Sequence, residues 1–245
     1  MKKWNLTPLQ IAVHIGAWIP LAWLVWAYNA HRLTVNPSQE ALQRTGRYAL
    51  VLLVLCLACT PLKTVFGWKG VMKVRRALGL YSFLYALIHV LILSGWDYQF
   101  HFAFLFADFS GKSYIWVGVA AWLILLALAA TAFRWSVKLL GKNWKRLHQL
   151  IYPAGLLAVL HYAWAKKGDI FRLQGDIRQP LYYGLLVILL LVLRIPPIAR
   201  GIKKLRASLS NRFSRFGLII RHELHTWLAR SRRANRAGSG APRSP

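Results

Sequence analysis

The chain is dominated by long apolar segments that few charged residues interrupt. Six such segments cover roughly residues 8–28, 46–62, 77–95, 114–133, 148–165 and 180–199. A helix needs about 20 predominantly apolar residues to cross the hydrocarbon core of a bilayer. A helix also satisfies its own backbone hydrogen bonds in lipid, which a lone strand cannot do. The sequence therefore predicts an all-α fold, a polytopic membrane helix bundle with six transmembrane helices.

Lysine and arginine are distributed unevenly among the segments that connect these spans. Of the 33 Lys and Arg residues, 25 lie in the N-terminus, the second and fourth connections, or the region after the last span. Cytoplasmic segments carry the excess of basic residues in membrane proteins, so both termini are expected to be cytoplasmic. The formal net charge of +27 follows this membrane pattern, and we do not expect nucleic-acid binding.

The chain divides into a membrane domain, residues 1–200, and a basic cytoplasmic tail, residues 201–245. Residues 210–230 alternate arginines with apolar residues at helical spacing, which predicts an amphipathic helix on the lipid surface. Residues 231–245 are rich in Arg, Gly, Ser and Pro and are expected to be disordered. The sequence contains neither a dinucleotide fingerprint nor a P-loop, so no nucleotide-binding domain is expected.

Two cysteines, Cys56 and Cys59, form a CxxC motif inside the second predicted span. Covalent haem attachment requires a histidine directly after the second cysteine, and Thr60 stands there instead. We interpret both cysteines as small buried apolar side chains.

Histidines inside predicted spans are the main candidates for a functional site, because ionisable residues are costly in lipid. With a cytoplasmic N-terminus, the third and fifth spans both run outward. His89 and His161 then lie level to within roughly 3 Å, at a rise of about 1.5 Å per residue. Two imidazoles at one depth on parallel helices can hold one haem iron between them. This pair is the most specific arrangement of residues in the chain.

The inner end of the bundle offers a second group of candidates. His148 opens the fifth predicted span, about 20 Å below His161, where it can serve a second haem or bond a lipid phosphate. Thirteen residues leave the two rings about 140° apart on a straight helix, although Pro153 could re-aim the lower half. Arg75 and Arg76 open the third span and act either as membrane anchors or as a site for a flavin phosphate or quinone head group.

Several ordered motifs resemble those of the MsrQ family, formerly YedZ, within the ferric reductase-like transmembrane group that also includes NADPH oxidases. The resemblance covers residues 1–200. The matching residues are Asn36-Pro37, Thr45-Gly46, Thr60-Pro61-Leu62, Arg75 to Leu80, Tyr85 to His89, Tyr114-Ile115, Trp144, Leu147-His148, Tyr152 and His161-Tyr162.

The resemblance implies a multi-pass protein of the bacterial inner membrane that carries electrons. Its electrons would come from the quinone pool or a cytosolic flavin reductase and pass through one or two haem b groups. FMN would be a further cofactor. The acceptor would be MsrP, a periplasmic molybdopterin subunit that reduces methionine sulfoxide in oxidised proteins. The family's iron ligands carry over onto His89, His148 and His161. NADPH oxidases have two histidines on the equivalent of the third span, and this chain has one.

Two other functions remain compatible with intramembrane histidines. One is a free-standing transmembrane ferric or metal reductase. The other is a transporter with a histidine proton relay, which predicts inverted repeats and broken helices. A reducible Soret band would exclude the transporter, and a neighbouring gene for a molybdopterin protein would favour the electron-transfer subunit over the metal reductase.

Overall fold

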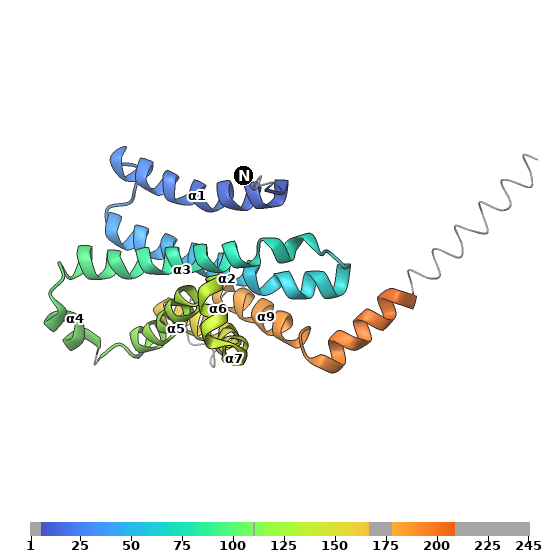
Figure 1. The fold of residues 1–245 in the computed structure, drawn as a ribbon. Coiled ribbons are helices and arrows are strands. Elements are labelled where there is room, and N and C mark those ends of the chain that lie inside the picture. The colour runs from blue at the N-terminus through green and yellow to red at the C-terminus, as the bar shows by residue number, and fades with distance from the viewer. Residues whose placement is uncertain (1–5, 110, 167–177, 209–245) are drawn as a thin grey trace, which may run out of the picture. The chain divides into compact units, whose positions relative to one another are not determined.

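The computed structural model describes residues 6–109, 111–166 and 178–208, and every regular element in these ranges is helical (Figure 1). This agrees with the predicted all-α fold. The long helices are α1 (Pro8–Asn29), α2 (Pro37–Phe66), α3 (Arg75–Ile92), α5 (Ser113–Ala130), α8 (Ile151–Ala165) and α9 (Arg178–Val192). The short elements are η1 (Gly70–Lys73), the π-helix η2 (Leu93–Asp97), α4 (Phe102–Phe109), α6 (Arg134–Leu140) and α7 (Lys142–His148).

The chain separates into two units, Met1–Ile195 and Pro196–Pro245. The first unit holds all the helices named above. In the second unit the structure describes one helix, Pro196–Ser208. The amphipathic helix predicted at 210–230 and the disorder predicted at 231–245 lie outside the described residues.

Among the described helices, four are long and apolar enough to cross a membrane: Pro8–Asn29, Pro37–Phe66, Arg75–Asp97 and Ser113–Ala130. A fifth is added if Arg178–Val192 and Pro196–Ser208 together form one broken span. Helix α8 has 15 residues because it begins at Ile151, three residues after the predicted start of the fifth span. The multi-pass prediction therefore holds, whereas six complete spans and the orientation of the termini remain predictions.

Helix α2 is the central helix of the bundle, and its bounds follow from its sequence. Asn36 caps the first turn by accepting a hydrogen bond from the Gln39 amide at 3.2 Å. Gly67 ends the helix in the left-handed conformation, with φ of 75°. Pro61 lies inside the helix and has no N–H, so the carbonyl of Leu57 one turn earlier lacks its helical donor.

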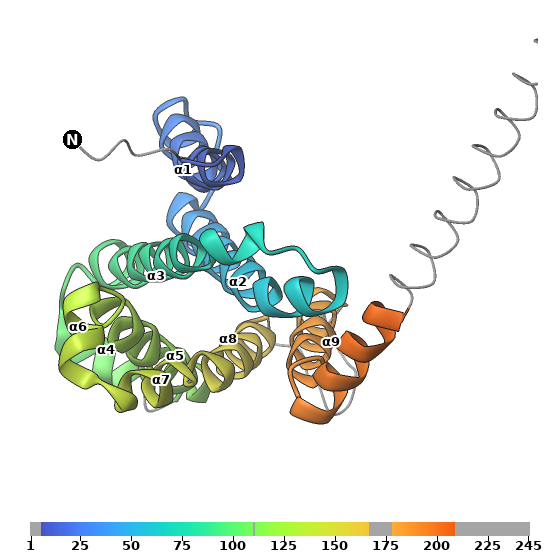
Figure 2. The same ribbon diagram turned by 45° about the vertical axis from the view of Figure 1, so that its right-hand side comes forward.

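Helices α2 and α3 pack along each other, α5 packs along α8, and α9 contacts both α2 and α8. Figure 2 shows α3, α2, α8 and α5 one after another around the interior of the bundle. The Ser82 hydroxyl on α3 donates to the Ala49 carbonyl on α2 at 2.8 Å, a close interhelical bond of the kind that stabilises helices in lipid. The bundle thus places α3 and α8, which carry the candidate histidines, on facing sides.

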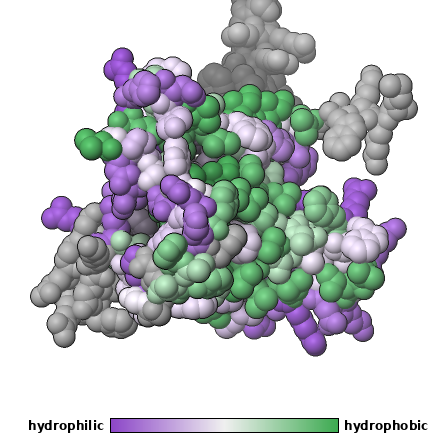
Figure 3. All heavy atoms as spheres, turned by 90° about the vertical axis from the view of Figure 1, so that its left-hand side faces the viewer, coloured by the Kyte–Doolittle hydropathy of each residue, from purple (hydrophilic) through white to green (hydrophobic). Residues whose placement is uncertain are grey.

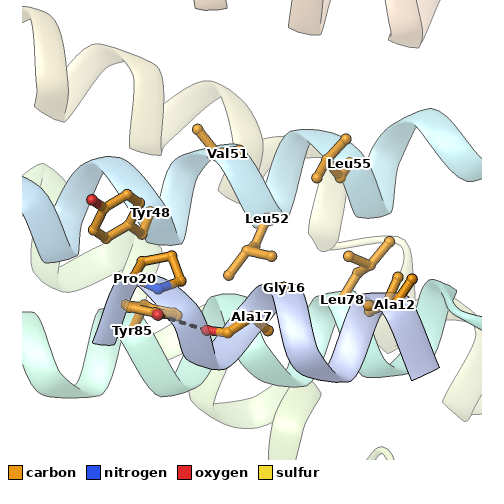
Figure 4. Close-up of a pocket in the computed structure, with 11 residues that line it drawn as sticks. Ala12, Gly16, Ala17, Pro20, Tyr48, Val51, Leu52, Leu55, Leu78 and Tyr85 are labelled. Carbon is orange, nitrogen blue, oxygen red and sulfur yellow. Dashed lines mark hydrogen bonds between the residues drawn. The ribbon is translucent and has the colours of Figure 1, made fainter. Parts of the chain in front are cut away.

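Helix α1 packs against α2 and α3 less extensively and leaves a groove of about 340 Å³ between the three helices (Figure 4). The groove is lined mainly by apolar residues, with Gly16 and Ala17 on the α1 side. Tyr85 on α3 is fully buried, and its hydroxyl donates to the Ala17 carbonyl at 2.6 Å. This hydrogen bond and the small residues together fix how α1 approaches the bundle.

Large apolar side chains are exposed on the outside of the bundle, including Trp18 and Ile19 on α1 and Leu185 and Leu189 on α9. Figure 3 shows apolar residues over much of one face. In water such a surface would favour aggregation, whereas in a bilayer it faces lipid. The surface therefore agrees with a membrane protein.

Candidate functional site

The structure brings the rings of His89 and His161 together in the bundle interior. Their centroids are 6.1 Å apart and their planes are nearly perpendicular, at 89°. His89 comes from α3 and His161 from α8, 72 positions later in the chain. Both side chains are half-buried. The sequence predicted that the two histidines lie at one depth, and the structure shows in addition that α3 and α8 turn them toward each other.

Each ring is fixed by a hydrogen bond from its Nδ1 atom to a backbone carbonyl. His89 Nδ1 lies 2.9 Å from the Leu42 oxygen on α2, and His161 Nδ1 lies 2.8 Å from the Tyr114 oxygen on α5. A carbonyl only accepts, so Nδ1 carries the proton and donates in both cases. The lone pair is then on Nε2, which is the arrangement found in metal-binding histidines.

A glycine makes each of these contacts possible. A methyl group on Gly46 would lie 3.0 Å from both Nδ1 and Cε1 of His89. A methyl group on Gly118 would lie 2.6 Å from Nδ1 and 2.8 Å from Cε1 of His161. Without a Cβ, each helix lets an imidazole lie against its backbone and reach the carbonyl one turn before the glycine.

The two halves of the bundle repeat this arrangement with the same spacing. In each half the histidine and its carbonyl partner are 47 positions apart, in α2–α3 for His89 and in α5–α8 for His161. Sequence reasoning missed Gly118, Leu42 and this internal repeat. The signal was present as two glycine–histidine pairs of equal spacing, but many glycines and histidines occur at incidental spacings.

The distance between the rings fits one iron ion. Imidazole nitrogens bind transition metals at about 2.0–2.1 Å, so two rings on opposite sides of one ion have centroids about 6 Å apart. Within the described residues, no group of three or more His, Cys, Asp or Glu side chains gathers to hold a metal ion. The donor set of two facing imidazoles is therefore suited to haem iron, whose other four ligands come from the macrocycle.

His148 lies elsewhere, at the end of α7. Its ring stacks on Trp144 with centroids 4.1 Å apart, and its Nε2 lies 3.2 Å from the Thr131 hydroxyl. The Trp144 indole donates to the Thr131 carbonyl at 2.9 Å. The sequence predicted that His148 opens the fifth span. In the structure it ends α7 instead, because the chain turns at 149–150 before α8 begins. The structure does not bring His148 to the paired rings, and its assignment as an iron ligand remains a prediction.

Arg75 and Arg76 are consecutive at the start of α3, but their side chains differ in exposure and in their neighbours. Arg75 is half-buried, and its carbonyl accepts a hydrogen bond from the Cys56 thiol at 3.3 Å. Arg76 is exposed, and its guanidinium lies 5.4 Å from the centre of the Phe133 ring. Only Arg75 therefore faces the interior, where it interacts electrostatically with His148 and with Arg194, a residue that sequence reasoning did not single out.

Comparison with protein families agrees with this helical membrane fold. The family described as ferric reductase like transmembrane component matches residues 45–159, a range that includes His89 and ends two residues before His161. The helical bundle and this match define a transmembrane protein of the ferric reductase-like class.

Several proteins named protein-methionine-sulfoxide reductase heme-binding subunit MsrQ are similar over most of the chain. The protein of Xanthomonas axonopodis pv. citri (strain 306) is 42% identical over 185 residues, 73% of this chain and 82% of the relative. That of Xanthomonas campestris pv. campestris (strain B100) is 39% identical over 196 residues, 77% and 87% of the two chains. That of Rhodospirillum rubrum is 35% identical over 199 residues, 81% and 92% of the two chains. The chain belongs to the MsrQ family.

Proposed function

We propose that this protein is a transmembrane electron-transfer subunit that binds haem b between His89 and His161. The facing rings, each with Nδ1 tied to a carbonyl and Nε2 left for the iron, are the observation that carries this proposal. Bound haem supplies a one-electron carrier. His89 and His161 would both hold this haem, whose chemistry would then be electron transfer rather than substrate binding.

The polypeptide's role is to hold the iron in one geometry. The hydrogen bonds to the Leu42 and Tyr114 carbonyls orient the rings and fix their neutral tautomers. Gly46 and Gly118 let the rings approach the helices closely enough to make those bonds. Rigid ligands of this kind reduce the rearrangement that accompanies a change of iron oxidation state.

The electron source and acceptor are proposed from the family. In this scheme electrons come from the quinone pool or a cytosolic flavin reductase and leave to the molybdopterin protein MsrP in the periplasm, with the chain in the bacterial inner membrane. FMN is the additional cofactor. Arg75 and Arg76 lie at the end of the bundle where electrons are proposed to enter. The lack of a nucleotide-binding fingerprint supports an electron supply from outside the chain.

The distance along α3 favours an intermediate carrier. Arg75 and His89 are 14 residues apart, about 21 Å along a helix. His148 lies on the Arg75 side of the bundle, because Arg75 and His148 interact electrostatically. A second haem or the flavin near His148 would shorten the electron's path from the inner face to the paired histidines.

The test is haem incorporation in His89→Ala and His161→Ala variants of the full chain. Each variant should lose most of its haem, measured as the ratio of extracted haem to protein and by the Soret band. His14→Ala is the matched control, because His14 bonds the Tyr81 hydroxyl at 2.8 Å between α1 and α3 and is not part of the paired rings. Full haem content with an unchanged spectrum in either test variant would refute the two-histidine site.

Delivery to the partner is a separate measurement. With reduced haem in place, methionine sulfoxide reduction should require MsrP, and reduction of ferric chelates should be slow. Fast chelate reduction without the partner would instead support the free-standing metal reductase.

A further inference from the structure

Arg194 follows the last turn of α9, and its guanidinium reaches into the bundle. Its Nη2 donates to the Leu57 carbonyl on α2, and the group lies 4.9 Å from the centre of the Tyr152 ring on α8. The Leu57 carbonyl is the one that Pro61 leaves without a helical donor. One nitrogen of Arg194 therefore has a structural role, replacing the missing N–H of Pro61.

Arg194 also has a side-chain hydrogen bond with Tyr152, but two of its three nitrogen atoms are not accounted for. Its Nε and Nη1 atoms are buried and have no hydrogen-bond partner among the described residues. Buried polar groups in native proteins are nearly always paired, so an unpaired charged donor indicates a ligand or ion that completes the site. The structural role of Nη2 does not account for these two atoms.

The surroundings of Arg194 carry positive charge. Within the part of the chain that the structure describes, the titratable groups that interact with it are Tyr152, Arg75 and Cys56, and none of these is a carboxylate. The chain has 6 acidic residues against 33 basic ones, so a counter-ion from the protein is scarce. Two arginines near each other repel unless an anion lies between them.

We infer that Arg194, together with Arg75, binds an oxyanion of a bound cofactor at the inner end, either a propionate of a second haem near His148 or a flavin phosphate. Arginine suits this role because its planar fork of N–H donors matches carboxylate and phosphate oxygens. The inference rests on the proposed function, since it assumes that such a cofactor is bound. The inference adds Arg194 as a binding residue. Arg194 lies 137 positions from Leu57, its hydrogen-bond partner, and is not close in sequence to His89 or His161.

Two variants separate the anion site from the structural role. Arg194→Gln removes the charge, but its amide can still donate to the Leu57 carbonyl. Pro61→Ala restores the missing N–H, so the carbonyl no longer needs Arg194. If Arg194 acts only on that carbonyl, Arg194→Gln should have no effect in the Pro61→Ala background. Arg178→Gln, at the exposed start of α9, is the matched control for loss of one arginine.

Binding to the cofactor-free full chain in lipid nanodiscs then identifies the oxyanion. FMN is compared with riboflavin, which lacks the phosphate, and haem with its dimethyl ester, which lacks the propionate charges. We expect Arg194→Gln, in the Pro61→Ala background, to weaken the binding of either FMN or the second equivalent of haem by about tenfold or more, equivalent to one charge-assisted hydrogen bond. The uncharged analogue of that cofactor should bind as before. A change confined to FMN assigns the phosphate, and a change confined to haem assigns a propionate.

Two outcomes would overturn the inference. They are unchanged binding of both charged cofactors, and equal losses for the charged and uncharged forms. Haem content in the His89 and His161 variants is independent of these results. If haem binding depends on His89 and His161 but cofactor binding does not change in Arg194→Gln, the inference is refuted and the proposed function stands.

Discussion

Gly118→Ala should damage the haem site through one methyl group. The added carbon would lie 2.6 Å from His161 Nδ1 and 2.8 Å from Cε1, distances that real side chains do not tolerate. The facing atoms belong to a rigid ring, so the ring must move as a whole. Moving it breaks the 2.8 Å bond to the Tyr114 carbonyl. It also turns Nε2 away from the orientation in which His161 would hold a haem iron.

The expected magnitude follows from the size of the clash. Forcing one extra methyl group into a packed core costs about 1–3 kcal/mol. Loss of the hydrogen bond adds about 1 kcal/mol. The sum, about 2–4 kcal/mol, corresponds to haem binding that is weaker by about 30- to 1,000-fold.

Two other glycines provide a graded comparison. Gly46→Ala should have a smaller effect, because its methyl group would lie 3.0 Å from the nearest atoms of His89. Gly79→Ala should leave haem binding unchanged, since the nearest atom is the Cys56 sulfur at an ordinary 3.5 Å. Titrating each cofactor-free variant with haem and monitoring the Soret band gives the haem affinities of the three variants, and hence their order. Equal affinities for Gly118→Ala and Gly79→Ala would refute the argument that glycine is needed for ring approach.

Three further predictions concern the inner end and the tail. Trp144→Phe should keep the stacking on His148 but lose the bond to the Thr131 carbonyl, lowering the free energy of unfolding by about 1 kcal/mol; a denaturation midpoint equal to that of the unmodified protein would contradict this. Replacing Arg75 and Arg76 together by Ala should slow haem reduction by the donor but not the transfer from dithionite-reduced haem to MsrP; stopped-flow absorbance separates the two steps, and a defect in transfer alone would reverse the proposed entry side. Truncation after Leu209 should preserve quinol-dependent haem reduction, and a truncated protein that inserts normally but cannot be reduced would show that the tail is needed.

The level of a residue along a helix could be read from the sequence. The apolar segments gave the helices, and the rise per residue put His89 and His161 at one depth. Helix ends were predicted less well, as the start of α8 shows. The break at 149–150 leaves His148 on α7, and only its stacking on Trp144 and contact with Thr131 show where the ring lies.

The rotation of each helix and the identity of its neighbours were decided by the tertiary structure. Gly118 faces His161 because α5 and α8 pack closely, and Arg194 reaches Leu57 across 137 positions because α9 lies against α2. Apolar spans are alike on most of their surface, so hydrophobicity alone does not say which helices meet in lipid. The sequence by itself therefore determined a membrane protein with two histidines at one depth. The packing of small residues decided that these histidines face each other, since only a close approach of the backbones allows their hydrogen bonds.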